Sequence, residues 1–116
     1  MNILFVEDHP ALRYGIAREI RAHGHTVHEA GSAELAMVVL AEHEVDVLIT
    51  DVGLPGDSGV VLAAEARAER PALHVVIVTG QDIGTADRDR DDGPTVLRKP
   101  FTWESLNAAF ARLGLG

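Results

Sequence analysis

Five polar side chains in this sequence stand at the ends of apolar runs, where they could act together. Glu7 and Asp8 follow the first run, Asp51 follows the third, Thr79 ends the fourth, and Lys99 follows the fifth. Clustered carboxylates repel one another, and a hard divalent cation such as Mg²⁺ relieves that repulsion because it prefers oxygen ligands. A lysine adds a compact positive charge that an oxyanion can meet. The pattern therefore predicts a metal-assisted site for an anionic group such as a phosphate.

This set of groups suits the transfer of a phosphoryl group onto a carboxylate. Asp51 would be the nucleophile and would form an aspartyl phosphate. The metal and Lys99 would neutralise charge on the transferring oxygens, while the Thr79 hydroxyl donates a hydrogen bond to one of them. Gly80 has no β-carbon and would leave an open approach for an in-line donor. Each residue alone has a simpler structural explanation, so the hypothesis depends on their joint occurrence.

For these side chains to meet, the apolar runs before them must lie side by side as parallel strands. Strand-length runs at residues 1–6, 26–30, 45–50, 74–79 and 95–97 alternate with helical periodicity at residues 11–23, 60–69, 102–113 and from the N-cap Ser32 to residue 42. Such alternation predicts an α/β fold with a doubly wound five-stranded parallel sheet flanked by helices. Sheets of this kind bind ligands at the carboxyl ends of their strands.

Two of the predicted helices carry specific expectations. In the second, Leu35, Val38, Val39 and Leu40 are expected to form the apolar stripe that faces the core. Between the fourth and fifth strands, residues 82–92 contain five Asp and two Arg residues, with Ile83 as the only large apolar side chain. A helix there could bury little apolar surface, so we expect the fourth helix to be short or irregular.

Composition limits the possible classes of function. The 116 residues, 47% of them hydrophobic, suit one domain spanning residues 1–116. A chain without cysteine has no disulfide, thiolate zinc site or cysteine nucleophile. A formal net charge of −8 argues against a nucleic-acid surface, because phosphates would be repelled. No apolar run approaches the roughly 20 residues of a membrane span and no signal-peptide pattern is present, so we expect a cytoplasmic domain without membrane insertion.

Four motifs occur in order along the chain. They are Phe5-Val-Glu7-Asp8, Ile49-Thr-Asp51-Val-Gly-Leu-Pro55-Gly-Asp-Ser-Gly59, Val78-Thr79-Gly80 and Lys99-Pro100-Phe101. Together they resemble the receiver domain of bacterial two-component response regulators, of the chemotaxis-regulator-like kind, and the resemblance covers nearly the whole chain. It implies the strand order 2-1-3-4-5. It also implies a cis peptide bond between Lys99 and Pro100.

The resemblance implies two overlapping groups of functional residues. The phosphoryl group would be bound by Asp51 as the phosphorylated residue, with Thr79 and Lys99 holding its oxygens. The Mg²⁺ ion would be bound directly by Asp8, through water by Glu7, and also by Asp51 and the backbone carbonyl of Gly53.

The resemblance further implies a phosphoprotein of a signalling phosphorelay, not a metabolic enzyme. The phosphoryl group would come from a histidine kinase or a histidine phosphotransfer protein, and the domain would catalyse only its own phosphorylation and dephosphorylation. Phosphorylation would change binding of an unknown downstream protein through the face of the fourth helix, fifth strand and last helix. Val96 stands where such domains usually carry Tyr or Phe, so we expect an order change or shift of residues 82–92 to replace the usual aromatic switch.

Other interpretations remain open on the sequence alone. Val96 favours a pseudo-receiver that acts only as a protein interaction module, whereas the complete set of acids disfavours it. A dehalogenase-type Mg²⁺-dependent phosphatase would need a second acid two residues after its nucleophile, where Gly53 stands. A flavin- or nucleotide-binding module is disfavoured because the first strand-to-helix turn lacks glycines. The histidines at 23, 25 and 28 lack a clear fourth ligand for zinc and are expected in a solvated turn and edge strand.

Overall fold

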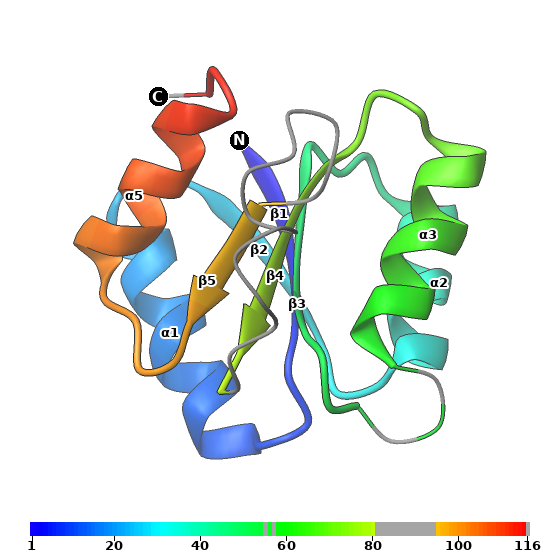
Figure 1. Cartoon of the computed structure of the whole chain (residues 1–116), viewed down its shortest axis with the longest axis horizontal. Coiled ribbons are helices and arrows are strands. Elements are labelled where there is room, and N and C mark those ends of the chain that lie inside the picture. Colours follow the sequence, from blue (N-terminus) through cyan, green and yellow to red (C-terminus); the bar gives the residue numbers. More distant parts are fainter. Residues whose placement is uncertain (55, 57, 81–94, 116) are drawn as a thin grey trace.

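The computed structural model describes residues 1–54, 56, 58–80 and 95–115, which form a three-layer α/β fold (Figure 1). Five parallel strands make one sheet in the order β2-β1-β3-β4-β5. The strands are β1 (Asn2–Val6), β2 (Thr26–Ala30), β3 (Val47–Asp51), β4 (His74–Thr79) and β5 (Thr95–Arg98). The predicted doubly wound sheet and its strand order are confirmed.

Helices cover both faces of this sheet. They are α1 (Pro10–Ala22), α2 (Ala33–Glu42), α3 (Gly59–Glu69) and α5 (Trp103–Arg112). Figure 1 shows α1 and α5 on one face and α2 and α3 on the other. The expectation of a short or irregular fourth helix at residues 82–92 lies outside the described residues. None of the helices in the described ranges combines the length and the apolar character that crossing a membrane requires.

The central strands pack against a separate hydrophobic core on each face. Leu4 and Leu48 are register partners that point into the core beneath α2 and α3. Their neighbours Phe5 and Ile49 are also partners, and they point into the core beneath α1 and α5. Strands buried on both faces have continuous apolar sequences, which is why they could be predicted. The shared register brings the carboxyl ends of β1 and β3 to the same edge of the sheet.

Side chains cap the starts of several helices, and the predicted N-cap Ser32 is confirmed. The Ser32 side chain accepts a hydrogen bond of 3.2 Å from the backbone N–H of Leu35. The Thr102 hydroxyl does the same for the N–H of Ser105, and the two form a capping box. At the start of α1, Nδ1 of His9 accepts from the third helical N–H. Capping of this kind pairs backbone donors that have no partner within their own helix.

The predicted apolar stripe of α2 is wrong for Leu35 and Val38, whereas Leu40 is buried and Val39 packs against the core. Leu35 and Val38 are 56% and 51% exposed. The buried face of the helix consists of Ala33, Ala36 and Leu40, a stripe with the same helical period. Packing of these small alanine side chains against the sheet, and not side-chain size, decides which of two stripes with the same helical period is buried. Large residues misled the prediction because two equally periodic stripes were available.

The histidine-rich turn before β2 contacts the last helix. The ring of His23 is exposed but stacks on the ring of Trp103, with centroids 4.0 Å apart. The ring of His25 is tilted against the same indole at 5.8 Å. The turn therefore helps to join the start of α5 to the sheet edge beside β2.

Gly59 is the glycine at which a side chain would cost most. Its N–H donates to the carbonyl of Val52 at 2.9 Å, and a Cβ there would lie 1.9 Å from the carbonyl oxygen of Asp51. We expect Gly59→Ala to lower the free energy of unfolding by about 3 kcal/mol, because backbone must move to relieve the overlap. Urea denaturation measures this change.

Gly15 supplies the control for that substitution. It is exposed in the interior of α1, and a Cβ there would meet no atom within 4 Å. Gly15→Ala should raise the free energy of unfolding by about 0.8 kcal/mol, because alanine has a higher helix propensity than glycine by about this amount. A Gly59→Ala protein as stable as the wild type would contradict the close approach of α3 to the end of β3.

Acidification should destabilise the fold partly through His28. Burial lowers the pKa of His28 below its ordinary value of 6.5, and the neighbouring His43 and Arg21 lower it further. The rings of His28 and His43 are stacked with centroids 4.3 Å apart. The unfolded chain therefore binds more protons than the folded chain below pH 6.5, so this contribution to stability is present above that pH and is lost as the pH falls through the folded pKa.

We expect the free energy of unfolding to fall as the pH is lowered from neutral through this range, and His43→Gln to make that dependence shallower by removing one source of repulsion. Chemical denaturation at a series of pH values measures both. Equal pH dependence in wild type and variant would exclude a role of the stacked pair.

Candidate functional site

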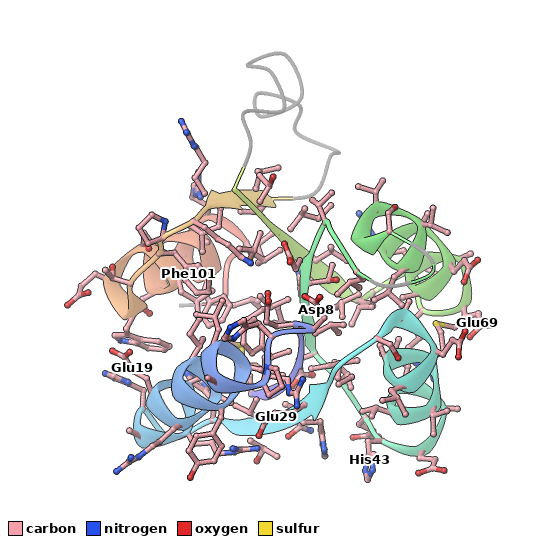
Figure 2. All side chains as sticks on the ribbon, turned by 90° about the horizontal axis from the view of Figure 1, so that it is seen from below. Asp8, Glu19, Glu29, His43, Glu69 and Phe101 are labelled. Atoms are coloured by element: carbon pink, nitrogen blue, oxygen red, sulfur yellow. The ribbon has the colours of Figure 1, made fainter. Side chains whose placement is uncertain are left out.

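The carboxyl edge of the sheet brings together three acids that are far apart in the sequence. Glu7 and Asp8 follow β1, and Asp51 is the last residue of β3. Each offers a carboxylate oxygen, and these oxygens all lie within 4.8 Å of one another. Figure 2 looks at this edge and shows Asp8 near the middle, between the two helical layers. Among the described residues, this is the only group of three or more His, Cys, Asp or Glu side chains close enough to share a metal ion.

Asp51 lies one residue deeper in its strand than predicted. The sequence placed the strand end at residue 50, but the ladder between β3 and β4 continues to the pair Asp51 and Val78. The N–H of Val52 then donates to the carbonyl of Val78 at 3.1 Å. The backbone of Asp51 is therefore fixed by the sheet, while its side chain keeps 13% exposure.

Lys99 connects two members of the acid group. Its Nζ lies 3.0 Å from Oε2 of Glu7 and 3.3 Å from Oδ2 of Asp51. Its backbone N–H donates to the carbonyl of Thr79 at 2.9 Å, which extends the pairing of β4 and β5 to this residue. The peptide bond between Lys99 and Pro100 is cis, as the resemblance implied.

Electrostatics at the site favour a charged lysine. Burial acts against the ammonium, yet the hydrogen bond to Glu7 and the negative charge of Asp51 outweigh it and raise the pKa of Lys99. Three ionised carboxylates with one ammonium leave two negative charges, which a divalent cation would neutralise. The donors are all oxygens, the ligand type that Mg²⁺ prefers. The residues present therefore fit such an ion.

The two acids that follow β1 have different surroundings. Glu7 is 3% exposed, and its carboxylate accepts hydrogen bonds from Lys99 and, at 3.3 Å, from the N–H of His9. Asp8 is exposed. The exposed acid is open to a ligand from solvent, whereas the buried acid forms the back of the site.

The remaining predicted residues lie near the same edge. Thr79 is buried at the carboxyl end of β4. Gly53 and Gly80 follow β3 and β4 and are exposed, and no atom of the described residues would lie within 4 Å of a Cβ added at either position. Val96 is partly buried in β5 beside Ile77.

Arg13 also contacts this site, which its place in the sequence does not indicate. Its Nη1 donates to the backbone carbonyl of Glu7 at 2.8 Å, so a side chain of α1 holds the turn that bears the acid pair. The sequence has no local signal for this contact, because an arginine on a helix usually faces solvent and its partner here is a backbone atom.

Comparison with known proteins assigns the chain to a family. The sequence matches the response regulator receiver domain over residues 3–111. It is 34% identical to the sensor kinase CckA of Brucella abortus, covering 90% of this chain and 12% of that protein. It is 31% identical to the two-component response regulator PhoP of Pseudomonas aeruginosa, covering 93% of this chain and 49% of that protein. The chain spans about half or less of the length of these curated relatives.

Solved structures agree with this assignment. The receiver domain from the hybrid histidine kinase CckA is 34% identical, with a TM-score of 0.81 and 100% of both chains covered. The response regulator TrrA of Thermotoga maritima, solved in complex with Mg(2+)-BeF, shares the fold at 24% identity, with a TM-score of 0.84 and 97% of both chains covered. This chain belongs to the receiver domain family of bacterial two-component response regulators, the phosphoacceptor domains of signalling systems.

Proposed function

We propose that residues 1–116 form a single receiver domain in which Asp51 accepts the phosphoryl group. The observation that best supports this is the meeting of three carboxylates and one ammonium at the carboxyl edge of the sheet. A cluster with two uncompensated negative charges is unfavourable unless it binds a cation. Glu7 and Asp51 both contact Lys99, but only Asp51 is also partly exposed. Asp51 is therefore accessible to a phosphoryl donor and lies beside an ammonium that can meet the phosphoryl oxygens.

Mg²⁺ would be bound by Asp8, Asp51 and the backbone carbonyl of Gly53, with Glu7 acting through water. When bound, the ion would neutralise charge on the oxygens of the phosphoryl group. The acid set that this requires is complete. A pseudo-receiver would have no need of it, and the proposal therefore favours a phosphorylated domain.

The side chains have distinct roles in the proposed transfer. A carboxylate oxygen of Asp51 attacks phosphorus and forms an O–P bond, while the P–N bond of a phosphohistidine breaks and its electron pair stays on the imidazole. Lys99, already 3.3 Å from Asp51, meets an oxygen of the transferred group, and the Thr79 hydroxyl donates a hydrogen bond to another. The chain would catalyse this step on itself, as it would the later loss of the group to water.

A groove beside the site suits the phosphoryl donor. It has a volume of about 410 Å³ and is lined by Leu12 and Ile16 of α1 and by Lys99, Pro100 and Phe101. Apolar helix side chains of a histidine kinase or histidine phosphotransfer protein would pack there and bring a phosphohistidine toward Asp51. With such a donor, the domain would act in the cytoplasm. The downstream partner would bind the face that includes β5 and α5.

The proposal predicts a covalent adduct at one residue. Incubation with acetyl phosphate and Mg²⁺ should add the mass of one phosphoryl group to the intact wild-type protein, because Asp51 is the nucleophile at the acid site. Asp51→Asn should show no adduct in the same intact-mass measurement.

Asp46→Asn is the control for that substitution. Asp46 is an exposed aspartate at the opposite end of β3, and its carboxylate accepts from the N–H of Asn2. This variant should form the adduct as the wild type does. A wild-type protein that takes no phosphoryl group, even from a phosphorylated histidine kinase, would support the pseudo-receiver instead.

Neutralising Asp8 should have opposite effects on stability with and without metal. Without Mg²⁺, Asp8→Asn removes one like charge from the cluster and should stabilise the fold by about 1 kcal/mol. With Mg²⁺ in excess, the wild type should gain stability by binding the ion, and the variant should not. Thermal unfolding with chelator and with added MgCl₂ measures both effects.

Glu19→Gln supplies the comparison for Asp8→Asn. Glu19 is an exposed acid of α1 outside the cluster. This variant should leave the Mg²⁺-dependent gain in stability intact. Equal Mg²⁺ responses of the wild type and Asp8→Asn would remove Asp8 from the proposed ligand set.

A further inference from the structure

Arg13 contacts the backbone of Glu7, a contact that would not be needed if this arginine served only to attach α1 to β2. It belongs to α1, and its side chain is 22% exposed. Nη1 donates to the carbonyl oxygen of Glu7 at 2.8 Å, while Nε lies 3.4 Å from Oε1 of Glu29 on β2. The guanidinium therefore connects three elements: the helix, the edge strand and the end of β1.

The orientation of the guanidinium favours Glu7 over Glu29. Nε is buried and makes no hydrogen bond within the described structure, although Glu29 is within ion-pair distance. A buried donor without a partner is unfavourable, and an arginine placed only to pair with Glu29 would align its Nε–H with that carboxylate. The space is also confined, because a Cβ on Gly31 would lie 3.0 Å from Nη1. In this orientation Nη1 donates a short hydrogen bond to the Glu7 carbonyl, while Nε lacks one.

The Glu7 carbonyl belongs to the peptide unit that joins the two acids. Because that unit is planar, a hydrogen bond to its oxygen also fixes the direction of the Asp8 N–H and the position of the Asp8 Cα. The rest of Glu7 is already held, since its N–H donates to the carbonyl of Ala30 and its carboxylate accepts from Lys99. Arg13 adds a hydrogen bond to the Glu7 carbonyl, the group through which Glu7 is joined to Asp8.

We propose that Arg13 is a positioning residue for metal binding, which orients the peptide between Glu7 and Asp8 so that the exposed carboxylate of Asp8 stays with the acid group. This inference depends on the proposed function, in which Asp8 binds Mg²⁺. Residues that orient metal ligands without contacting the ion typically change metal affinity by about 10-fold to 100-fold when replaced.

Charge and position predict opposite effects, which makes the role testable. Arg13 is a cation near the acids, so if only its charge mattered, its removal would reduce repulsion of Mg²⁺ and strengthen binding. If Arg13 orients the acid pair, its removal weakens binding. The sign of the change in Mg²⁺ affinity therefore separates the two.

Arg21 provides a matched control on the same helix. Its Nη1 pairs with Oε2 of Glu29 at 3.1 Å, and its Nη2 donates to the carbonyl of Val27 at 2.6 Å. It therefore attaches α1 to β2 through the same glutamate that Arg13 contacts. Within the described part of the chain, its partners include no atom of the acid pair.

The experiment is calorimetric titration of the full chain with MgCl₂. For Arg13→Met we expect the dissociation constant for Mg²⁺ to rise about tenfold, the lower end of the range for groups that act through a ligand. For Arg21→Met we expect a value close to the wild type. Urea denaturation of both variants separates loss of affinity from loss of stability.

Unchanged or tighter Mg²⁺ binding by folded Arg13→Met would overturn the inference, as would equal weakening by Arg21→Met. If Arg13→Met does not fold, the pair Arg13→Lys and Arg21→Lys keeps the charge and decides the question by NMR. The Asp8 amide resonance should then shift more in Arg13→Lys than in Arg21→Lys, and equal shifts would overturn the inference.

The outcomes for the wild type separate this inference from the proposed function. If the wild type does not bind Mg²⁺, the proposed function itself is overturned. If the wild type is phosphorylated and binds Mg²⁺, and Arg13→Met binds Mg²⁺ equally well, only the positioning role is overturned.

Discussion

Repulsion among three carboxylates at one edge of a sheet is the constraint to which the rest of the structure responds. The acids come from two strands, and their oxygens lie within 4.8 Å of one another. Left to themselves, like charges at this distance would separate or take up protons. They stay together because β1 and β3 are paired in fixed register and buried on both faces, and because Lys99 pairs with two of them. The core thus stabilises an arrangement of charge that a flexible chain would avoid.

The backbone of Asp51 is fixed by the sheet, whereas its side chain is partly exposed. Its carbonyl lies under the start of α3, where Gly59 allows an approach that any side chain would block, and its strand pairing reaches Val78. The carboxylate itself is partly exposed and pairs with the Lys99 ammonium. A fixed backbone with an accessible carboxylate suits the nucleophile proposed at Asp51, because the reaction would then require little reorganisation of the protein.

The sequence was sufficient for the strands and for the acids that follow them, because strands buried on both faces have unbroken apolar sequences and parallel strands end at a common edge. The sequence did not predict which face of α2 is buried, because Leu35 and Ala36 belong to two different stripes with the same helical period. Only packing against the sheet decides which stripe is buried. Arg13 could not be found because its partner is a backbone oxygen, which no residue type marks. The exposed ring of His23 on Trp103 is likewise a contact between distant segments, visible only once the strand order is known.

Glu7 is the residue through which these features are linked. Lys99 contacts its carboxylate from one side, and Arg13 contacts its carbonyl from the other. The two cations act on different atoms, so they do not compete. An anionic group arriving at Asp51 would attract Lys99 and weaken its bond to the Glu7 carboxylate, since one ammonium would then face a further negative partner. The carbonyl bond from Arg13 would be unaffected by that movement, and the peptide between the two acids would keep its orientation while the lysine changes partners. Because Arg13 holds the Glu7 backbone and Lys99 pairs with the Glu7 side chain, the ion pair could change without a change in the orientation of the backbone.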